Sequence, residues 1–262
     1  MRLQVLVSTM NQTNYSLVKK MNIQSDAVIV NQCDKNGIEE FKNDKWPVRW
    51  INSTERGLSR SRNAAIRNSV DDVCLISDDD IEYIDSYEKL ILDQFKQYPD
   101  ADIIVFQVEG IEGTFKKYHC KVRELNYLTS MKVASVEITF RLDNINKYGI
   151  RFNELFGAGA KYCMGEENIF LFDCLKQGLK IVYVPIKIGN LHLGESTWFR
   201  GYNKEYFISK GAAFTGMSKL FSFLFIIQFA IRKYKLFRGK VRILQAVKYM
   251  LEGRREYLEK TY

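Results

Sequence analysis

Prolines, histidines and closely spaced cysteines are scarce in this chain. Its 262 residues include three prolines, two histidines and five cysteines, and no linker rich in glycine or serine interrupts them. This composition argues against several domains joined by flexible segments. The cysteines form no close pairs, and neither they nor the histidines show zinc-site spacing. We therefore expect reduced thiols in a cytosol and no structural zinc.

Acidic residues are absent from one long stretch, between Tyr206 and Leu251. The whole chain carries a formal charge of +8 and this stretch alone carries +9, so the remainder is close to neutral. A polyanion, either a nucleic acid or an anionic membrane, is the kind of partner that such a stretch fits. The basic residues are Lys210, Lys219, Arg232, Lys233, Lys235, Arg238, Lys240, Arg242 and Lys248.

A membrane-spanning apolar run is also missing. The stretch at 220–231 has twelve residues and contains Ser222 and Gln228, whereas a helix needs about 20 apolar residues to span a bilayer. With the basic residues that follow, it is typical of an amphipathic helix lying on an anionic leaflet. The alternative is a helix that packs on the rest of the protein with its lysines in solvent.

Strands and helices alternate along the first half of the chain. Apolar runs predict strands at 3–8, 26–31, 48–51, 73–76 and 102–109, and helices are expected near 14–21, 38–42, 57–70 and 86–98. Such alternation predicts an α/β fold with an open, mixed, mostly parallel sheet flanked by helices. We expect this domain to occupy residues 1–216, followed by a basic helical extension at 217–262.

Three consecutive aspartates, Asp78, Asp79 and Asp80, follow the strand predicted at 73–76. Ligands of open α/β sheets bind beyond the carboxyl ends of the strands. Adjacent carboxylates repel one another unless a cation joins them, and Mg²⁺ and Mn²⁺ prefer carboxylate oxygens shared with substrate phosphates. The triplet therefore predicts a divalent metal site, with a solvated acidic turn as the alternative.

A second acidic pair, Glu166 and Glu167, follows a loop of small residues in FGAGAKYCMGEEN. The pair lies in the first turn of a predicted helix, where the helix dipole favours a carboxylate anion. This placement is typical of a general base, although acidic residues are also common at helix N-termini with no catalytic role.

The order of GLSRSRN, SDDD and GEEN, with a KIVYVP strand after them, resembles the family 2 glycosyltransferases of bacterial capsule, exopolysaccharide and lipopolysaccharide assembly. The resemblance covers roughly residues 3 to 215. It implies the GT-A fold, a nucleotide-sugar donor (expected to be a UDP-sugar), a divalent metal (Mn²⁺ or Mg²⁺) and inversion at the anomeric carbon. The acceptor would be a glycan or a lipid-linked sugar.

The resemblance also implies roles for the acidic residues. Asp79 would be the principal metal ligand and Asp80 a ligand or its support, while Asp78 would contact the ribose or the donor sugar. Glu167 would be the catalytic base, with Glu166 as the alternative, because the family usually has an aspartate as the second acid of this pair.

Further residues are assigned to the donor by the same resemblance. Arg62 and Asn63 would lie near the base and ribose, and Thr9 would line the nucleotide cleft. The family usually has an aspartate after the second strand to accept from uracil N3–H, where this chain has Asn31 and Gln32; an amide oxygen accepts the same bond.

The segment after the last core strand completes the expected site. A histidine there often lies near the metal and diphosphate in this family, which assigns that role to His192. Arg200 follows on a segment expected to act as a lid over the donor.

Two other functions remain open on sequence grounds. A sugar-nucleotide nucleotidyltransferase also pairs carboxylates with a metal, but its usual glycine-rich and basic loop is missing from STMNQTNYS. A non-catalytic module could bind a membrane or nucleic acid through the basic stretch, but the acidic triplet would oppose polyanions. We expect no nucleic-acid partner and a peripheral protein on the cytoplasmic face of the cell membrane.

Overall fold

The structure, a computed structural model, describes residues 1–194 and 201–260. It forms two compact units. Unit 1 comprises Met1–Arg56, Arg60–Arg151 and Cys174–Glu195, and unit 2 comprises Gly57–Ser59, Phe152–Asp173 and Ser196–Tyr262. Helix α6 (Glu166–Lys176) contributes its first residues to unit 2 and its last to unit 1.

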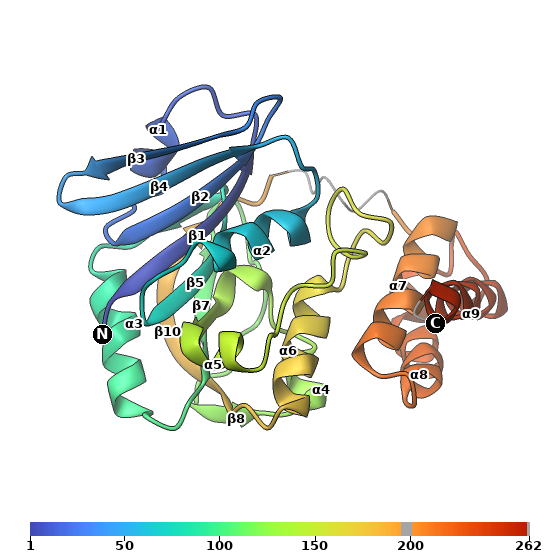
Figure 1. Ribbon diagram of the computed structural model, residues 1–262. Coiled ribbons are helices and arrows are strands. Elements are labelled where there is room, and N and C mark those ends of the chain that lie inside the picture. Colours follow the sequence, from blue (N-terminus) through green and yellow to red (C-terminus); the bar gives the residue numbers. More distant parts are fainter. Residues whose placement is uncertain (195–200, 261–262) are drawn as a thin grey trace. The chain divides into compact units, whose positions relative to one another are not determined.

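Within the described residues, ten strands form one sheet in unit 1 (Figure 1). The order is β3-β4-β2-β1-β5-β9-β7-β10-β6, and β8 pairs with β10. Strands β1, β2, β4, β5, β7 and β10 run in one direction and the others run against them. The predicted open, mixed and mostly parallel sheet is therefore confirmed. The strands are β1 (Leu3–Met10), β2 (Asp26–Gln32), β3 (Gly37–Asn43), β4 (Trp46–Ser53), β5 (Val73–Asp78), β6 (Ile81–Tyr83), β7 (Ile103–Gly110), β8 (Arg123–Leu125), β9 (Ile138–Arg141) and β10 (Ile181–Leu191).

The helices that accompany the sheet are mostly short. Their apolar residues join a core in which the central strands are buried on both faces, as parallel sheets require; Leu3, Val5, Leu75 and Ile104 have no exposed surface. The helices are α1 (Ser16–Lys20), α2 (Leu58–Arg67), α3 (Tyr87–Gln97), α4 (Tyr127–Ser130) and α5 (Leu142–Lys147), with a 3₁₀ turn, η1 (Ser135–Glu137).

One predicted element is wrong. The segment at 38–42, expected as a short helix, belongs to strand β3, which pairs antiparallel with β4 from Gly37↔Asn52 to Asn43↔Trp46. Apolar residues at 38 and 41 fit a helical spacing, but the turn that follows contains Asp44 with φ of 54°. That left-handed residue closes a hairpin, and pairing with β4 decides the conformation.

The parallel strands are aligned at their carboxyl ends. Ser8 of β1 lies opposite Asp78 of β5, and Thr9 lies opposite Asn31 of β2, which in turn lies opposite Asn52 of β4. The chain leaves β1 toward β2 on one side and returns later as β5 on the other. This is a topological switch point, where open α/β sheets bind ligands.

Unit 2 contains the helices α7 (Lys204–Met217), α8 (Ser222–Phe237) and α9 (Ile243–Lys260), coloured orange to red in Figure 1. Helices α7 and α9 touch backbone to backbone, since a Cβ on Gly211 would lie 1.9 Å from the Met250 carbonyl oxygen and one on Gly253 would lie 2.0 Å from that of Ile208. Because of this contact α7 belongs with the later helices, so the compact units do not divide at the predicted boundary after residue 216. Among the described helices, none combines the length and the apolar character that a bilayer crossing requires.

Candidate active site

The acidic triplet lies at the switch point of the sheet in unit 1. Asp78 is the last residue of β5, and Asp79 and Asp80 form the turn that leads into β6. The Thr9 hydroxyl, at the carboxyl end of β1, donates a hydrogen bond of 2.5 Å to Asp79 Oδ2. Thr9 of β1 and the turn after β5 thus meet at Asp79, while the expected role of Thr9 in lining the nucleotide cleft stays a prediction.

A chain of hydrogen bonds runs from this point across the ends of four strands. Gln12 Nε2 donates to Thr9 Oγ1 at 2.9 Å, and the Gln12 backbone N–H donates to Asn31 Oδ1 at 2.9 Å. Asn31 Nδ2 then donates to Asn52 Oδ1 at 2.9 Å, which also accepts from Trp50 Nε1 at 3.1 Å. The Asn31 amide both donates and accepts, so it links the two halves of the chain along the rim of the sheet from β4 to β5.

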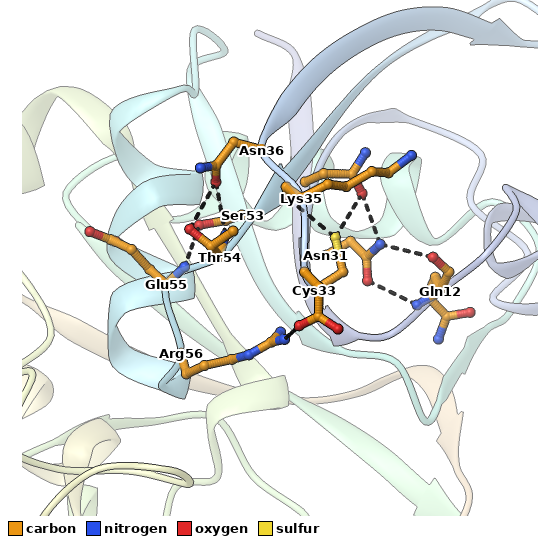
Figure 2. A network of polar contacts seen from close by, with 11 residues as sticks. Gln12, Asn31, Cys33, Lys35, Asn36, Ser53, Thr54, Glu55 and Arg56 are labelled. Carbon is orange, nitrogen blue, oxygen red and sulfur yellow. Dashed lines mark hydrogen bonds and ion pairs between the residues drawn. The ribbon is translucent and has the colours of Figure 1, made fainter.

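The loops after β2 and β4 are tied together beside this chain (Figure 2). Asn36 Oδ1 accepts from the Thr54 backbone N–H at 2.8 Å, and Cys33 Sγ lies 3.5 Å from Asn52 Oδ1. At the outer edge Arg56 Nη2 contacts Asp34 Oδ1 at 2.5 Å. The two loops therefore form one polar surface at the same end of the sheet as the triplet.

Asn31 and Gln32, expected to contact the nucleotide base, are enclosed in this structure. Asn31 has no exposed surface, and its oxygen already accepts from Gln12 while its NH₂ group donates to Asn52 and to the Gln12 carbonyl at 3.0 Å. Gln32 is 5% exposed. What the structure shows for Asn31 is a structural role, holding the loop after β1 against β4.

The side chain of Arg62, on α2, contacts the first aspartate of the triplet. Its side chain is 1% exposed, and its Nη2 lies 2.9 and 3.2 Å from the two carboxylate oxygens of Asp78 and 2.9 Å from Ser135 Oγ of η1. Asn63, the next residue, is 3% exposed. Arg62 therefore pairs with Asp78 and orients it.

The charge of Asp80 is less well compensated than that of Asp78, which pairs with Arg62. Burial of its carboxyl, followed by the neighbouring charges of Asp78 and Asp79, raises the pKa of Asp80 to about 6. Burial disfavours the charged form of a carboxyl, and neighbouring negative charges disfavour it further. Among the described residues no group of three or more histidine, cysteine or acidic side chains forms a ready-made metal cluster.

His192 lies beside the triplet. Its backbone N–H donates to the Asp80 carbonyl oxygen at 2.9 Å, directly after the pairing of Leu191 with Ile81. Its Nδ1 lies 3.0 Å from Glu112 Oε1, in the loop after β7. The structure therefore brings His192 to the acidic turn, and its expected role near a metal and diphosphate stays a prediction. Arg200, the last predicted donor contact, lies outside the described residues.

Glu166 and Glu167 begin α6 in unit 2, where their surroundings differ. Glu166 is 7% exposed and is covered by the small-residue loop, since a Cβ on Gly157 would lie 3.3 Å from its carboxyl carbon. Glu167 is half-buried, and its carboxylate interacts electrostatically with Lys210 of α7. Burial lowers the pKa of Lys210 while the charge of Glu167 opposes that shift. Glu167 is the more accessible carboxylate of the two.

Sequence reasoning missed four residues that build the site. Gln12 and Asn52 carry the hydrogen-bond chain, Ser135 holds Arg62, and Glu112 holds His192. Gln12 follows β1, the strand that carries Thr9 near its end, so its position was a usable signal. Ser135 and Glu112 are distant from every motif in the sequence, and only the pairing of β5, β9, β7 and β10 brings them close.

Solved structures and a protein-family model match this chain. A search of curated proteins found no match. Among solved structures, residues 1–349 of S. aureus TarS in complex with UDP-GlcNAc share 14% identity at a TM-score of 0.68, over 97% of this chain and 79% of that one. The same TarS fragment in complex with UDP shares 13% identity at a TM-score of 0.66, over 97% and 81%. A longer TarS structure gives 13% identity and 0.62, over 92% and 46%.

At these identities the structural likeness shows the fold alone, which is the GT-A fold. The family model for glycosyl transferase family 2 is more direct, because it matches residues 7–164, more than half of the 262 residues. That span contains Thr9, Arg62, the acidic triplet and the loop that leads to α6. The chain belongs to glycosyl transferase family 2 and is a glycosyltransferase.

Proposed function

We propose that this glycosyltransferase is inverting and metal-dependent, and that it transfers a sugar from a UDP-linked donor to a glycan or lipid-linked acceptor in surface polysaccharide synthesis. The observation that carries the proposal is the hydrogen-bond chain from Trp50 to Asp79, which fixes the acidic turn at the switch point of the sheet. A diphosphate donor needs such an edge, with a polar cleft on one side and a cation site on the other.

The residues at the turn fit Mg²⁺ or Mn²⁺. Asp79 and Asp80 supply hard oxygen ligands, and the raised pKa of Asp80 reflects negative charge that a cation would relieve. Mg²⁺ is commonly held by one or two carboxylates with substrate phosphates completing the sphere, and Asp79 and Asp80 would be those carboxylates. A cation bound there would neutralise charge on the diphosphate leaving group. His192 would face the same region.

Glu167 is the proposed base. Its carboxylate would accept the proton of the acceptor hydroxyl as that oxygen bonds to the anomeric carbon, while the bond from carbon to the diphosphate oxygen breaks. The dipole of α6 and the Lys210 ammonium both favour the anion that this role requires. Glu166 would instead support the small-residue loop, because Gly157 leaves it little space.

The donor would lie along the ends of β1, β2 and β5. Arg62 and Asp78 form a fixed ion pair there, so Asp78 would present its remaining acceptor capacity to a ribose or sugar hydroxyl. The relatives in complex with UDP-GlcNAc and UDP support a uridine diphosphate donor. Since Asn31 is enclosed, the uracil would contact the loops after β2 and β4 unless the Asn31 side chain turns outward.

The side chains of unit 2 support peripheral binding to an anionic membrane. Large apolar side chains project from the segment before α8 and from α8 itself: Leu220 is 81% exposed, Leu224 61% and Ile231 64%. Basic residues follow on the same helix and after it, including Lys235 and Arg238, both exposed. Apolar groups would enter the interface and the cations would meet lipid headgroups, each worth about 1 kcal/mol near the surface. We accordingly place the protein on the cytoplasmic face of the membrane, close to lipid-linked acceptors.

Nucleoside diphosphate release from a panel of UDP-, GDP- and dTDP-sugars tests the enzymatic proposal. The full chain should release UDP in the presence of Mn²⁺ or Mg²⁺ and lose this activity with a chelator. Release that persists undiminished with the chelator would overturn the metal dependence. Product stereochemistry, read by NMR from the anomeric coupling, would test inversion.

A further inference from the structure

The loop after β7 is hydrogen-bonded to the end of β10 and to the segment that follows it. The Ile111 backbone N–H donates to the Leu191 carbonyl oxygen at 3.0 Å, and Glu112 Oε2 accepts from the Leu193 backbone N–H at 2.7 Å. Gly110 makes the approach possible, because a Cβ there would lie 2.3 Å from the Gly113 carbonyl oxygen and 2.6 Å from Leu193 Cδ1. The Glu112 carboxylate therefore has a defined position relative to His192.

The second oxygen of the same carboxylate determines the chemistry of the imidazole. Glu112 Oε1 lies 3.0 Å from His192 Nδ1. A glutamate carboxyl is ordinarily ionised at neutral pH. An ionised carboxylate can only accept hydrogen bonds. Nδ1 must then carry the proton, which leaves Nε2 of a neutral ring with a free lone pair.

We infer that Glu112 is a positioning residue that holds His192 as its Nδ1–H tautomer beside the acidic turn, so that Nε2 can bind the divalent cation or accept from the donor. The inference rests on the proposed function, because it gives His192 its role there. The hydrogen bond from the His192 backbone to Asp80 fixes the other end of the arrangement. A carboxylate behind a ligating histidine sets its ring orientation and increases its basicity.

The tautomer can be measured directly, since the chain has only two histidines. Long-range ¹H–¹⁵N correlation spectra of the full chain at about pH 8, where an ordinary imidazole is neutral, should show His192 protonated at Nδ1. His192→Asn assigns the signals, and His119 is the internal reference. A proton on Nε2 of His192 in the wild type would overturn the inference.

Glu112→Gln is the sharpest variant. Its amide oxygen can still accept from the Leu193 backbone, while its NH₂ group faces Nδ1 as a donor, so the proton should move to Nε2. The matched control is Glu109→Gln, which removes an exposed carboxylate near the end of β7; this carboxylate pairs with Lys187. The control should leave the tautomer unchanged, and an unchanged tautomer in Glu112→Gln would contradict the inference.

Binding of Mn²⁺ in the presence of UDP gives a second measurement. Glu112→Gln and Glu112→Ala should weaken Mn²⁺ binding about 10- to 100-fold, while Glu109→Gln should not. If Asp79→Asn abolishes Mn²⁺ binding and the Glu112 variants do not alter it, the inference is wrong and the proposed function stands. If Asp79→Asn has no effect on Mn²⁺ binding either, the metal part of the proposed function is wrong, and the NMR experiment still decides the Glu112 contact.

Discussion

The two units hold their carboxylates in contrasting surroundings. In unit 1 Asp78, Asp79 and Asp80 are adjacent, Arg62 pairs with the first of them, and the pKa of Asp80 is raised. In unit 2 the accessible Glu167 begins a helix and interacts with the Lys210 ammonium. Crowded carboxylates attract a cation and lose charge without one, whereas a carboxylate with a cationic neighbour keeps its charge. The contrast is the basis of the two proposed roles, a metal site in unit 1 and a base in unit 2.

Asp79→Asn, on the unit 1 side of the comparison, is expected to reduce activity more than any other substitution. It removes the charge of the ligand that Thr9 orients, so sugar transfer should fall to background and Mn²⁺-dependent UDP binding should be lost. The fold should persist, because the buried strand β5 supplies its stability. Asp93→Asn, an aspartate of α3 that pairs with Lys89 and Lys96, is the control for transfer assays and thermal unfolding. Full activity of Asp79→Asn would contradict the metal role.

Glu167→Gln tests the unit 2 side of the comparison. The amide is nearly isosteric but accepts no proton, so turnover should decrease about 10²- to 10⁴-fold with donor binding preserved. Glu166→Gln should lose less, since Glu166 is covered by the loop at Gly157. Turnover numbers and UDP affinity for both variants decide the assignment; a larger loss in Glu166→Gln would move the base one residue back.

Neutralising two basic residues at the end of α8 and directly after it should weaken membrane binding moderately and change the rate of sugar transfer little. Lys235→Gln with Arg238→Gln should weaken association with anionic vesicles about 10- to 30-fold, given about 1 kcal/mol for each charge. Lys89→Gln with Lys96→Gln removes two charges from α3 of unit 1 and is the control. Co-sedimentation of the full chain is the measurement, with neutral vesicles for comparison. Substitutions are preferable to truncation after 216, which would separate α7 from α9. Equal binding by all variants would favour a helix with solvated lysines.

Asp80→Asn should produce the smallest of these effects. It should raise the thermal stability of the protein rather than lower it. A carboxyl whose pKa is raised to about 6 in the fold, from 3.8, makes the folded state less stable as pH rises from about 4 to 6. Without added metal the variant should therefore unfold at a higher temperature than the wild type at pH 8, and the difference should vanish below pH 4. Thermal unfolding across this range is the measurement. A lower melting temperature of the variant at pH 8 would show that Asp80 is stabilised as an anion.

The amino-acid sequence by itself determined the alternation of strands and helices, the acidic turn after β5 and the acidic pair that opens α6. These features are local, because apolar runs define buried strands and carboxylates at their ends are visible in a few residues. It left three functions open, and the family match decided for glycosyl transfer. It was wrong at β3, where the hairpin with β4 outweighed a helical spacing of apolar residues.

Only the tertiary structure decided which side chains meet. It enclosed Asn31 within the hydrogen-bond chain from Trp50 to Asp79, and it brought Ser135 to Arg62 and Glu112 to His192. These partners lie 73 and 80 residues apart in sequence. Their contacts depend on strand order and register, because a sheet aligns the ends of strands that the sequence separates. No local pattern of residues carries that information.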